Sequence, residues 1–383
     1  MWGRTLFTEE HDLYRESVRR FVAESVVPHR ERWEAAGVVD RDLFLAAGRA
    51  GILGVAAPTE HGGGGVADFR FNAILSEELA RADVLAAGLG LSLQADIALP
   101  YFLTGCSPEQ AARWLPDIVA GRTILALAMT EPGAGSDVAG IATTAIRDGD
   151  DYIVDGAKTF ITNGLNADLV VTAVKTTPSA DRKGISLLVV EADRQGFSRG
   201  RKLAKVGQHA ADTAELFFDG VRVPRDNVLG EVDRGFYTMM GHLTQERLSV
   251  AVQATAQARR AYEHSLAYAK QRQAFGAPIG SFQHNRFVLA EMKTEVDIAQ
   301  AYVDRCVVAH VAGELDSTEA AQAKWWTPEL CQRVVDRGVQ LHGGYGYMAE
   351  YPIARAWIDS RIQTIYAGTT EVMKEIVGRS LGL

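Results

Sequence analysis

The spacing of hydrophobic and polar residues changes twice along the chain and predicts three regions. In the first region, up to about residue 124, apolar residues recur at the spacing that places them on one face of a helix. The clearest example is Tyr14, Val18, Phe21 and Val22. Thr8 before an acidic turn predicts the N-cap of this helix. The segment 76–87, rich in Glu, Leu and Ala, predicts a further helix.

Short β-rich runs replace the helical spacing in the second region. They cover residues 124–129, 152–154, 158–162, 168–174, 185–190 and 216–218. Turns rich in Gly, Asp and Asn separate them. Because no helical pattern lies between the runs to serve as a crossover, we expect an antiparallel sandwich or barrel rather than a parallel α/β sheet.

The third region returns to long helices. No proline interrupts the chain between Pro224 and Pro278, so residues 236–270 predict one helix about 50 Å long at 1.5 Å per residue. A second helix is predicted over 282–312. Its apolar face consists of Val288, Met292, Val296, Val303 and Val307. Two more helices, one ending near Leu341 and one after Gly368, complete a predicted bundle.

These patterns predict an α+β protein with three domains. The expected boundaries are 1–124 for an N-terminal helical domain, 125–230 for a middle antiparallel β domain and 231–383 for a C-terminal four-helix bundle. The length agrees, since 383 residues correspond to two or three domains of about 150 residues each.

Composition excludes several classes of function. The 40 Lys and Arg residues against 48 Asp and Glu residues give a net charge of −8, which argues against nucleic acid as the partner. Three scattered cysteines fit a reducing compartment better than a disulfide scaffold, and the histidine spacing predicts no metal site. The start, Met1–Phe7, lacks a signal-peptide pattern. Gln94, Asp96 and Pro100 interrupt the most apolar stretch, 85–103, so we expect no membrane span and a cytoplasmic protein.

Five peptides carry more chemistry than the rest of the chain. A Gly-rich turn with hydroxyls, 129–137, follows an apolar run and exposes backbone N–H groups that suit a phosphate or an electron-rich ring. The peptide 158–164 is a run ending in an Asn-Gly turn. Residues 270–276 end the long predicted helix, and 340–346 combine a glycine C-cap with Gln, His and Tyr. The Gly-Thr-Thr of 365–371 predicts a helix start, which favours anionic or polarised ligand atoms.

Taken together, these five peptides resemble those of the acyl-CoA dehydrogenase family, and so does the order of helical, β and helical regions. The resemblance implies an FAD-dependent oxidoreductase of fatty acid metabolism and β-oxidation, which converts an acyl-CoA thioester to trans-2-enoyl-CoA. It also implies a homotetramer that passes electrons to electron-transfer flavoprotein.

Matching the motifs residue by residue implies a cofactor site and a substrate site. The residues expected to contact FAD are Met129, Thr130, Ser136, Phe160, Thr162, Arg272, Phe275, Gln283, Gln340, Gly344, Thr369 and Glu371. Of these, Arg272, Phe275, Gln283, Gln340 and Gly344 would reach the FAD of a neighbouring subunit. The residues expected to contact substrate are Ser136, Arg247, Tyr366, Ala367 and Gly368.

One departure from the family pattern bears on the catalytic base. Many members carry the catalytic glutamate in a Tyr-Glu-Gly-Thr peptide, where this chain has Ala367. A subset that includes the long-chain and isovaleryl-CoA dehydrogenases places the base on the long helix, at the position matched by Glu246. Helical spacing puts Glu246 in a largely apolar stripe, where desolvation raises the pKa of a carboxyl group and makes it a stronger base. The alternative is a carboxylate paired with a cation or exposed at the edge of the stripe.

Other roles stay open at this stage. Glu371, at a predicted helix start, and Glu350, in a predicted turn, are weaker candidates for the base. Arg247 could shape the entrance, bind the CoA portion or pair structurally with an acid. The main-chain N–H of Ala367 is expected to help polarise the thioester carbonyl.

Two other functions fit the same motifs. One is a related flavoenzyme, such as an oxidase or monooxygenase, or a dehydrogenase acting on a carrier-protein-bound or non-fatty acyl thioester. The other is a non-catalytic flavoprotein paralogue, which the missing glutamate at Ala367 would suggest.

Overall fold

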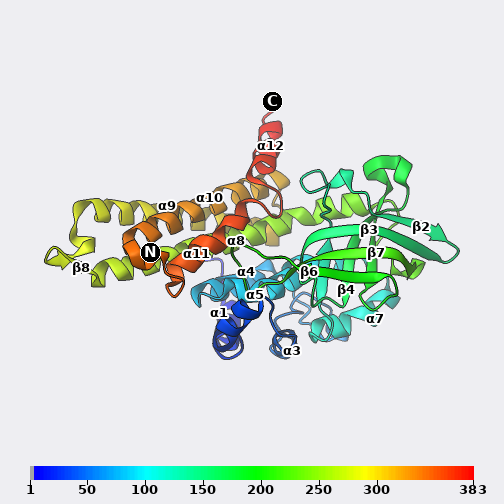
Figure 1. Cartoon of the computed structure of the whole chain (residues 1–383), viewed down its shortest axis with the longest axis horizontal. Coiled ribbons are helices and arrows are strands. Elements are labelled where there is room, and N and C mark those ends of the chain that lie inside the picture. Colours follow the sequence, from blue (N-terminus) through cyan, green and yellow to red (C-terminus); the bar gives the residue numbers. More distant parts are fainter. Residues whose placement is uncertain (1–3) are drawn as a thin grey trace.

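The computed structural model describes residues 4–383. The first three residues, part of the segment that lacks a signal-peptide pattern, lie outside the described residues. Figure 1 shows an elongated molecule with a β-sheet at one end and a helical bundle at the other. The long helix α8, Gly235–Gln271, runs from the sheet into the bundle, and the N-terminal helices lie along it.

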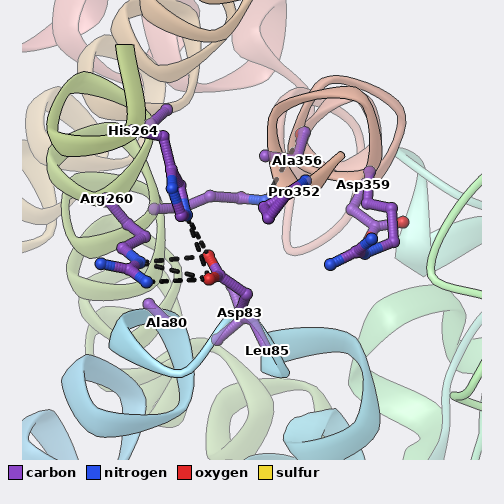
Figure 2. Close-up of a pocket in the computed structure, with 11 residues that line it drawn as sticks. Ala80, Asp83, Leu85, Arg260, His264, Pro352, Ala356 and Asp359 are labelled. Carbon is purple, nitrogen blue, oxygen red and sulfur yellow. Dashed lines mark hydrogen bonds and ion pairs between the residues drawn. The ribbon is translucent and has the colours of Figure 1, made fainter. Parts of the chain in front are cut away.

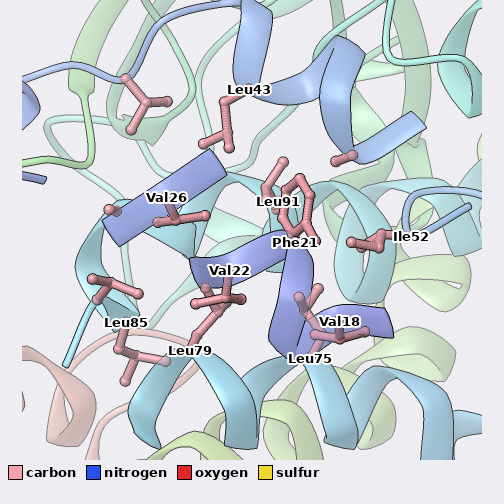
Figure 3. Packing of buried hydrophobic residues seen from close by; sticks show 14 of the residues in the cluster. Val18, Phe21, Val22, Val26, Leu43, Ile52, Leu75, Leu79, Leu85 and Leu91 are labelled. Atoms are coloured by element: carbon pink, nitrogen blue, oxygen red, sulfur yellow. The ribbon is translucent and has the colours of Figure 1, made fainter. Parts of the chain in front are cut away.

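The N-terminal region is helical, as the sequence predicts. Its helices are α1 Glu9–Phe21, α2 Arg30–Ala36, α3 Asp42–Arg49, α4 Phe69–Arg81, α5 Leu85–Ser92, α6 Leu99–Gly105 and α7 Pro108–Val119. A π-helical segment, η4 Leu93–Ala98, joins α5 to α6. Thr8 is the N-cap of α1, and its backbone N–H donates to His11 Nδ1. Val18, Phe21 and Val22 pack into a buried cluster with residues of α3, α4 and α5 (Figure 3).

The predicted helix over 76–87 is wrong in one respect, because the chain breaks between α4 and α5. Asp83 has a left-handed φ of 59° and accepts hydrogen bonds from Arg260 and His264 of α8 (Figure 2). Burial opposes ionisation of Asp83, but the hydrogen bonds from His264 and Arg260 outweigh it and lower the pKa of this carboxyl. A tertiary ion pair thus ends a segment that local propensity would continue.

The middle region is a seven-stranded sheet. Its strands are β1 Leu125–Ala128, β2 Thr144–Asp148, β3 Asp151–Thr162, β4 Leu169–Lys175, β5 Ile185–Glu191, β6 Phe197–Lys202 and β7 Thr213–Pro224. The order is β1-β4-β2-β3-β7-β6, with β5 on β4. Most pairs are antiparallel, as expected, but β4 runs parallel to β1 and β2. The pattern missed β2 and β6, whose alternation is mostly polar, and split β3 at Gly156, where φ is 150°.

The C-terminal region contains α8, α9 Gln283–Val311, α10 Ser317–His342, α11 Pro352–Ser360 and α12 Thr370–Ser380. The predicted apolar face of α9 is buried at Met292, Val296, Val303 and Val307, and Val288 is partly buried. The sequence prediction missed α11, a short helix with proline in its first turn. A two-stranded hairpin, β8 Gln273–Ala274 and β9 Ala277–Pro278, joins α8 to α9 at the end of the bundle farthest from the sheet (Figure 1).

The continuous helical stretch Leu85–Gly105 is long and apolar enough to cross a membrane by length and composition alone. Of its most apolar window, 72% is buried inside the fold. Burial of this kind is typical of a core helix, and the stretch lies against α8, where it forms one wall of the site described next.

Candidate active site

A cavity of about 540 Å³ lies where the sheet, the α5–η4 stretch, the first half of α8 and the 366–376 segment meet. The predicted site residues that line it are Met129, Thr130, Ser136, Phe160, Thr162, Glu246, Arg247, Tyr366, Ala367 and Gly368. The structure therefore brings together residues from three of the five peptides and from α8, across more than 200 positions of sequence.

Glu246 is the buried acid of this cavity. Only 6% of its surface is exposed, and its carboxylate accepts a hydrogen bond of 2.8 Å from the Tyr101 hydroxyl. Burial raises the pKa of Glu246 to about 7, while the Tyr101 hydrogen bond and the charge of Arg247 partly oppose the rise. A carboxyl group with a pKa near neutrality is suited to take up a proton and release it again.

Tyr101 is a site residue that the sequence prediction missed. It lies on α6, is fully buried, and its ring packs at 4.2 Å against His242, one turn before Glu246 on α8. In the sequence Tyr101 belongs to an apolar stretch that carries no motif. The signal that could have found it is the one tyrosine of an apolar segment that must pack against the helix carrying Glu246.

The positive charges beside Glu246 are also buried. Arg247 is 7% exposed, and its Nε contacts no acceptor among residues 4–383. Burial lowers the pKa of the Arg247 guanidinium, and Glu246 opposes this change. Lys324, from α10, is fully buried and donates to the main-chain oxygen of Gly368. Burial, with the nearby charge of Arg247, lowers the pKa of Lys324 to about 7, although Glu371 opposes it.

The turn that Lys324 holds presents Ala367 to the cavity. Ala367 has a left-handed φ of 52°, a conformation that costs a non-glycine residue roughly 1 kcal/mol or more. Its main-chain N–H makes no hydrogen bond to any of residues 4–383. A free N–H at the wall of a cavity, close in sequence to an anchored carbonyl, is a suitable donor for an oxygen of a bound molecule.

The sheet side of the cavity has an exposed aromatic ring. Phe160 has a φ of 59° and is 68% exposed. Beneath the adjoining turn, the fully buried Lys158 pairs with Glu131 at 2.8 Å and donates to the Met129 oxygen at 3.1 Å. This pair, also missed from the sequence, fixes the turn against β3. An exposed aromatic face next to a turn with accessible main-chain groups fits a flat heteroaromatic ring such as a flavin.

Three family models match successive parts of the chain: the N-terminal domain of acyl-CoA dehydrogenase over residues 8–122, the middle domain over 126–221 and the C-terminal domain over 233–382. The long-chain specific acyl-CoA dehydrogenase of Sus scrofa mitochondria is 46% identical over 380 residues, which cover 99% of this chain and 88% of the relative. The chain belongs to the acyl-CoA dehydrogenase family.

Solved structures agree with this assignment. An acyl-CoA dehydrogenase from Geobacillus kaustophilus superposes with a TM-score of 0.97 at 47% identity, with all of each chain covered. A glutaryl-CoA dehydrogenase from Mycobacterium smegmatis, in complex with FADH2, superposes with a TM-score of 0.89 at 26% identity, over 98% of this chain and 95% of the other. The chain is therefore an oxidoreductase that oxidises acyl-CoA with FAD, and the resemblance inferred from the five peptides is confirmed.

The remaining predicted cofactor residues of this acyl-CoA dehydrogenase lie apart from the main cavity. Arg272, Gln340 and Gly344 line a second pocket of about 490 Å³ near the β8–β9 hairpin, far from the sheet (Figure 1). Phe275 in that hairpin is 96% exposed, and Gln283 begins α9 with an exposed side chain.

Two further cofactor candidates lie at the start of α12. Thr369 is its N-cap and accepts from the N–H of Val372. Glu371 is exposed in the first turn, and hydrogen bonds from its own backbone and from Thr369 lower the pKa of its carboxyl. Glu350 is exposed as well. Neither of these rival acids lines the main cavity, whereas Glu246 does.

Proposed function

We propose that Glu246 is the base that removes the α-proton of the acyl-CoA substrate in this enzyme. The observation that carries the proposal is that a buried carboxyl group with a pKa near 7 lines the cavity, while alanine occupies position 367. The methyl group of Ala367 cannot accept a proton. The carboxylate of Glu246 is held by Tyr101, so its orientation is fixed before substrate binds.

The residues around Glu246 have matching roles in the proposed reaction. The thioester carbonyl accepts a hydrogen bond from the Ala367 N–H, which stabilises the negative charge that develops as the α-proton leaves. Lys324, bound to the Gly368 oxygen, holds that turn in place. Phe160 and Thr162 would hold the ring of FAD, which when bound would supply the hydride acceptor, N5, for the β-hydrogen.

The substrate and cofactor residues of the main cavity divide by position. Tyr366, Ala367 and Gly368 border the thioester, and the buried Arg247, next to Glu246, contacts the substrate from the wall of the cavity. Met129, Thr130 and Ser136 contact the flavin edge, with Ser136 also reaching substrate. Phe160 and Thr162 lie against the flavin ring. Support comes from the common lining of one cavity.

The second pocket supports an assembly of several copies. Arg272, Phe275, Gln283, Gln340 and Gly344 lie too far along the bundle to hold the flavin of their own chain. We propose that they bind the adenine and diphosphate part of FAD in a neighbouring subunit of a homotetramer, while Thr369 and Glu371 contact the cofactor of their own subunit.

The wider context of the reaction is proposed on the family resemblance. Electron-transfer flavoprotein accepts the electrons, and the reaction belongs to fatty acid β-oxidation in the cytoplasm. The chain divides at 1–124, 125–230 and 231–383. Each division falls between elements, close to the limits of the three matching family models.

Anaerobic titration of the purified holoenzyme with acyl-CoA thioesters tests the proposal. We expect the flavin absorbance to fall with about one equivalent of a suitable thioester, and trans-2-enoyl-CoA to appear. In air, a dye acceptor should sustain turnover with little peroxide. Peroxide release at the turnover rate would instead indicate an oxidase, and a flavin that no thioester reduces would indicate the non-catalytic paralogue.

The hydrogen bond from Tyr101 leads to a prediction on pH dependence. Glu246 acts only when ionised, so the rate of flavin reduction should be low at pH 5.5 to 6, rise through about 7 and level off above it. In Tyr101→Phe the hydrogen bond that lowers the pKa of Glu246 is lost, so the midpoint should move to higher pH. Stopped-flow flavin reduction across pH measures both profiles. Tyr302→Phe, which removes a hydroxyl bonded to Gln322, is the matched control, and an equal midpoint in both variants would contradict the role of Tyr101.

A further inference from the structure

Beyond Glu246 along α8, the cavity is lined by a polar side chain that has no partner within residues 4–383. Gln253 lies on α8, lines the cavity and is only 4% exposed. Among residues 4–383 its amide makes no hydrogen bond. A buried carboxamide can make several hydrogen bonds and is costly to leave without any, so an unpaired amide at a cavity wall indicates that a bound molecule supplies the partner.

Contacts between α8 and the α5–η4–α6 stretch indicate that Gln253 lies at the end of the cavity away from its opening. Tyr101 meets Glu246, and Asp96 meets Ser249, so the two stretches run antiparallel. The other end opens between the exposed Arg182 and the half-buried Phe236, both of which line the cavity. A thioester positioned at Glu246 with its CoA toward that opening directs its acyl chain toward Gln253.

The same end of the cavity has a further polar group. Ser249 also lines the cavity, and its hydroxyl donates to Asp96 at 2.6 Å, which leaves the oxygen lone pairs of Ser249 able to accept. Gln253 lies four residues further along α8, on the same face of the helix. An end built for a plain hydrocarbon tail would be lined by apolar side chains alone.

We propose that Gln253 selects acyl-CoA substrates whose chain carries a hydroxyl group near its far end. The hydroxyl accepts from Gln253 Nε2 and donates to Ser249 Oγ, so the amide gains an acceptor for one of its N–H groups and the hydroxyl makes both of its hydrogen bonds. Seven residues separate Glu246 from Gln253, about 10 Å along the helix axis, and an extended chain covers this with roughly eight bonds of about 1.5 Å. The inference rests on the proposed function, because Glu246 fixes where the α-carbon lies.

A plain acyl chain at the same place would displace water from the amide without replacing its hydrogen bonds. The cost of an unpaired buried polar group corresponds to about tenfold or more in an equilibrium or rate.

The test compares kcat/KM of the holoenzyme for ω-hydroxydecanoyl-CoA and decanoyl-CoA with a dye acceptor. The wild type should prefer the hydroxylated thioester by about tenfold. Gln253→Leu should reverse the preference, and Gln332→Leu, which alters a glutamine outside the cavity lining, should leave it unchanged.

Three outcomes would overturn the inference. Equal kcat/KM values for the two thioesters in the wild type would show that the amide does not bind the chain. A ratio that Gln253→Leu leaves unchanged would assign the preference to another residue. Weaker FAD binding or a shifted flavin spectrum in Gln253→Leu would make the flavin the partner of the amide. Failure of the proposed role of Glu246 gives a different result. In that case Glu246→Gln retains activity with both thioesters, while the wild type still differs in kcat/KM between the hydroxylated and the plain thioester.

Discussion

Glu246→Gln is expected to bind FAD and acyl-CoA but to lose flavin reduction by about 10³-fold or more. The amide keeps the size of the carboxyl group and can still accept from the Tyr101 hydroxyl, so the cavity should keep its shape. It cannot take up the α-proton, and the loss of a positioned base costs 10²- to 10⁴-fold. Anaerobic stopped-flow mixing with a good thioester measures the rate, and flavin absorbance before mixing measures the bound cofactor.

The thermal stability of Glu246→Gln distinguishes loss of the base from misfolding as the cause of the lost flavin reduction. The pKa of Glu246 is raised in the folded state, so ionisation favours the unfolded chain and lowers stability as pH rises from about 4.5 through about 7. Glutamine does not ionise, so at pH 8 the variant should melt at or above the temperature of the wild type. A variant that melts well below the wild type, or one that keeps full activity, would contradict the assignment.

A second substitution tests whether a carboxyl group at position 367 reaches the same α-carbon of the substrate as Glu246. Ala367 borders the same cavity as Glu246, so adding Ala367→Glu to Glu246→Gln should restore part of the rate. Rescue is expected to be incomplete for two reasons. Glutamate at position 367 must adopt the left-handed φ of 52°, and it lacks the hydrogen bond that Tyr101 donates to Glu246. Ala367→Gln in the same background is the matched control and should restore nothing.

The elements that the sequence predicted best are long helices with a simple local signal. The helices α8 and α9 end within two residues of their predicted limits, because no proline interrupts α8 and because α9 buries one stripe over many turns. The strands β2 and β6 were missed because their outward positions face water and their inward positions are few. The break at Asp83 could not be predicted, since its cause lies about 180 residues away in Arg260 and His264.

The candidate site shows the same division between local and distant information. The glycine-rich and aromatic peptides could be read from the chain, because turns and helix starts have local signatures. Tyr101, Lys324 and Gln253 carry no signature of their own. Their roles depend on which helices pack side by side, as when α6 brings a hydroxyl to the acid of α8. Resemblance to the family supplied the residues on the motifs, whereas the supporting contacts came only from the structure.

Lys158→Met is expected to destabilise the enzyme by about 3–5 kcal/mol. Lys158 is fully buried and pairs with Glu131, which also accepts from the N–H groups of Ala142 and Thr143. Burial lowers the pKa of Lys158 to about 8 although Glu131 opposes this, so the lysine is still a cation at pH 7. Its removal leaves a buried anion unpaired. It also frees the Met129 oxygen, so FAD should dissociate more readily. Urea denaturation and flavin release measure the two effects, and Lys183→Met on the exposed surface is the control.

The pH dependence of the stability lost in Lys158→Met tests whether the unpaired Glu131 carboxylate is its cause. In the wild type burial opposes ionisation of Glu131, but Lys158 and the hydrogen bonds outweigh it and lower its pKa. The resulting stabilisation is present above the unfolded pKa of about 4.5 and is lost as pH falls below it. In Lys158→Met the acid has lost its cation, so it takes up a proton at higher pH, and the deficit should shrink as the pH is lowered from 8 to 5. Lys158→Met with Glu131→Gln should recover much of the stability at pH 8, because it removes the charge that lacks a partner. A deficit that is the same at pH 5 and pH 8, and that the double variant does not reduce, would assign it to lost packing around the lysine stem.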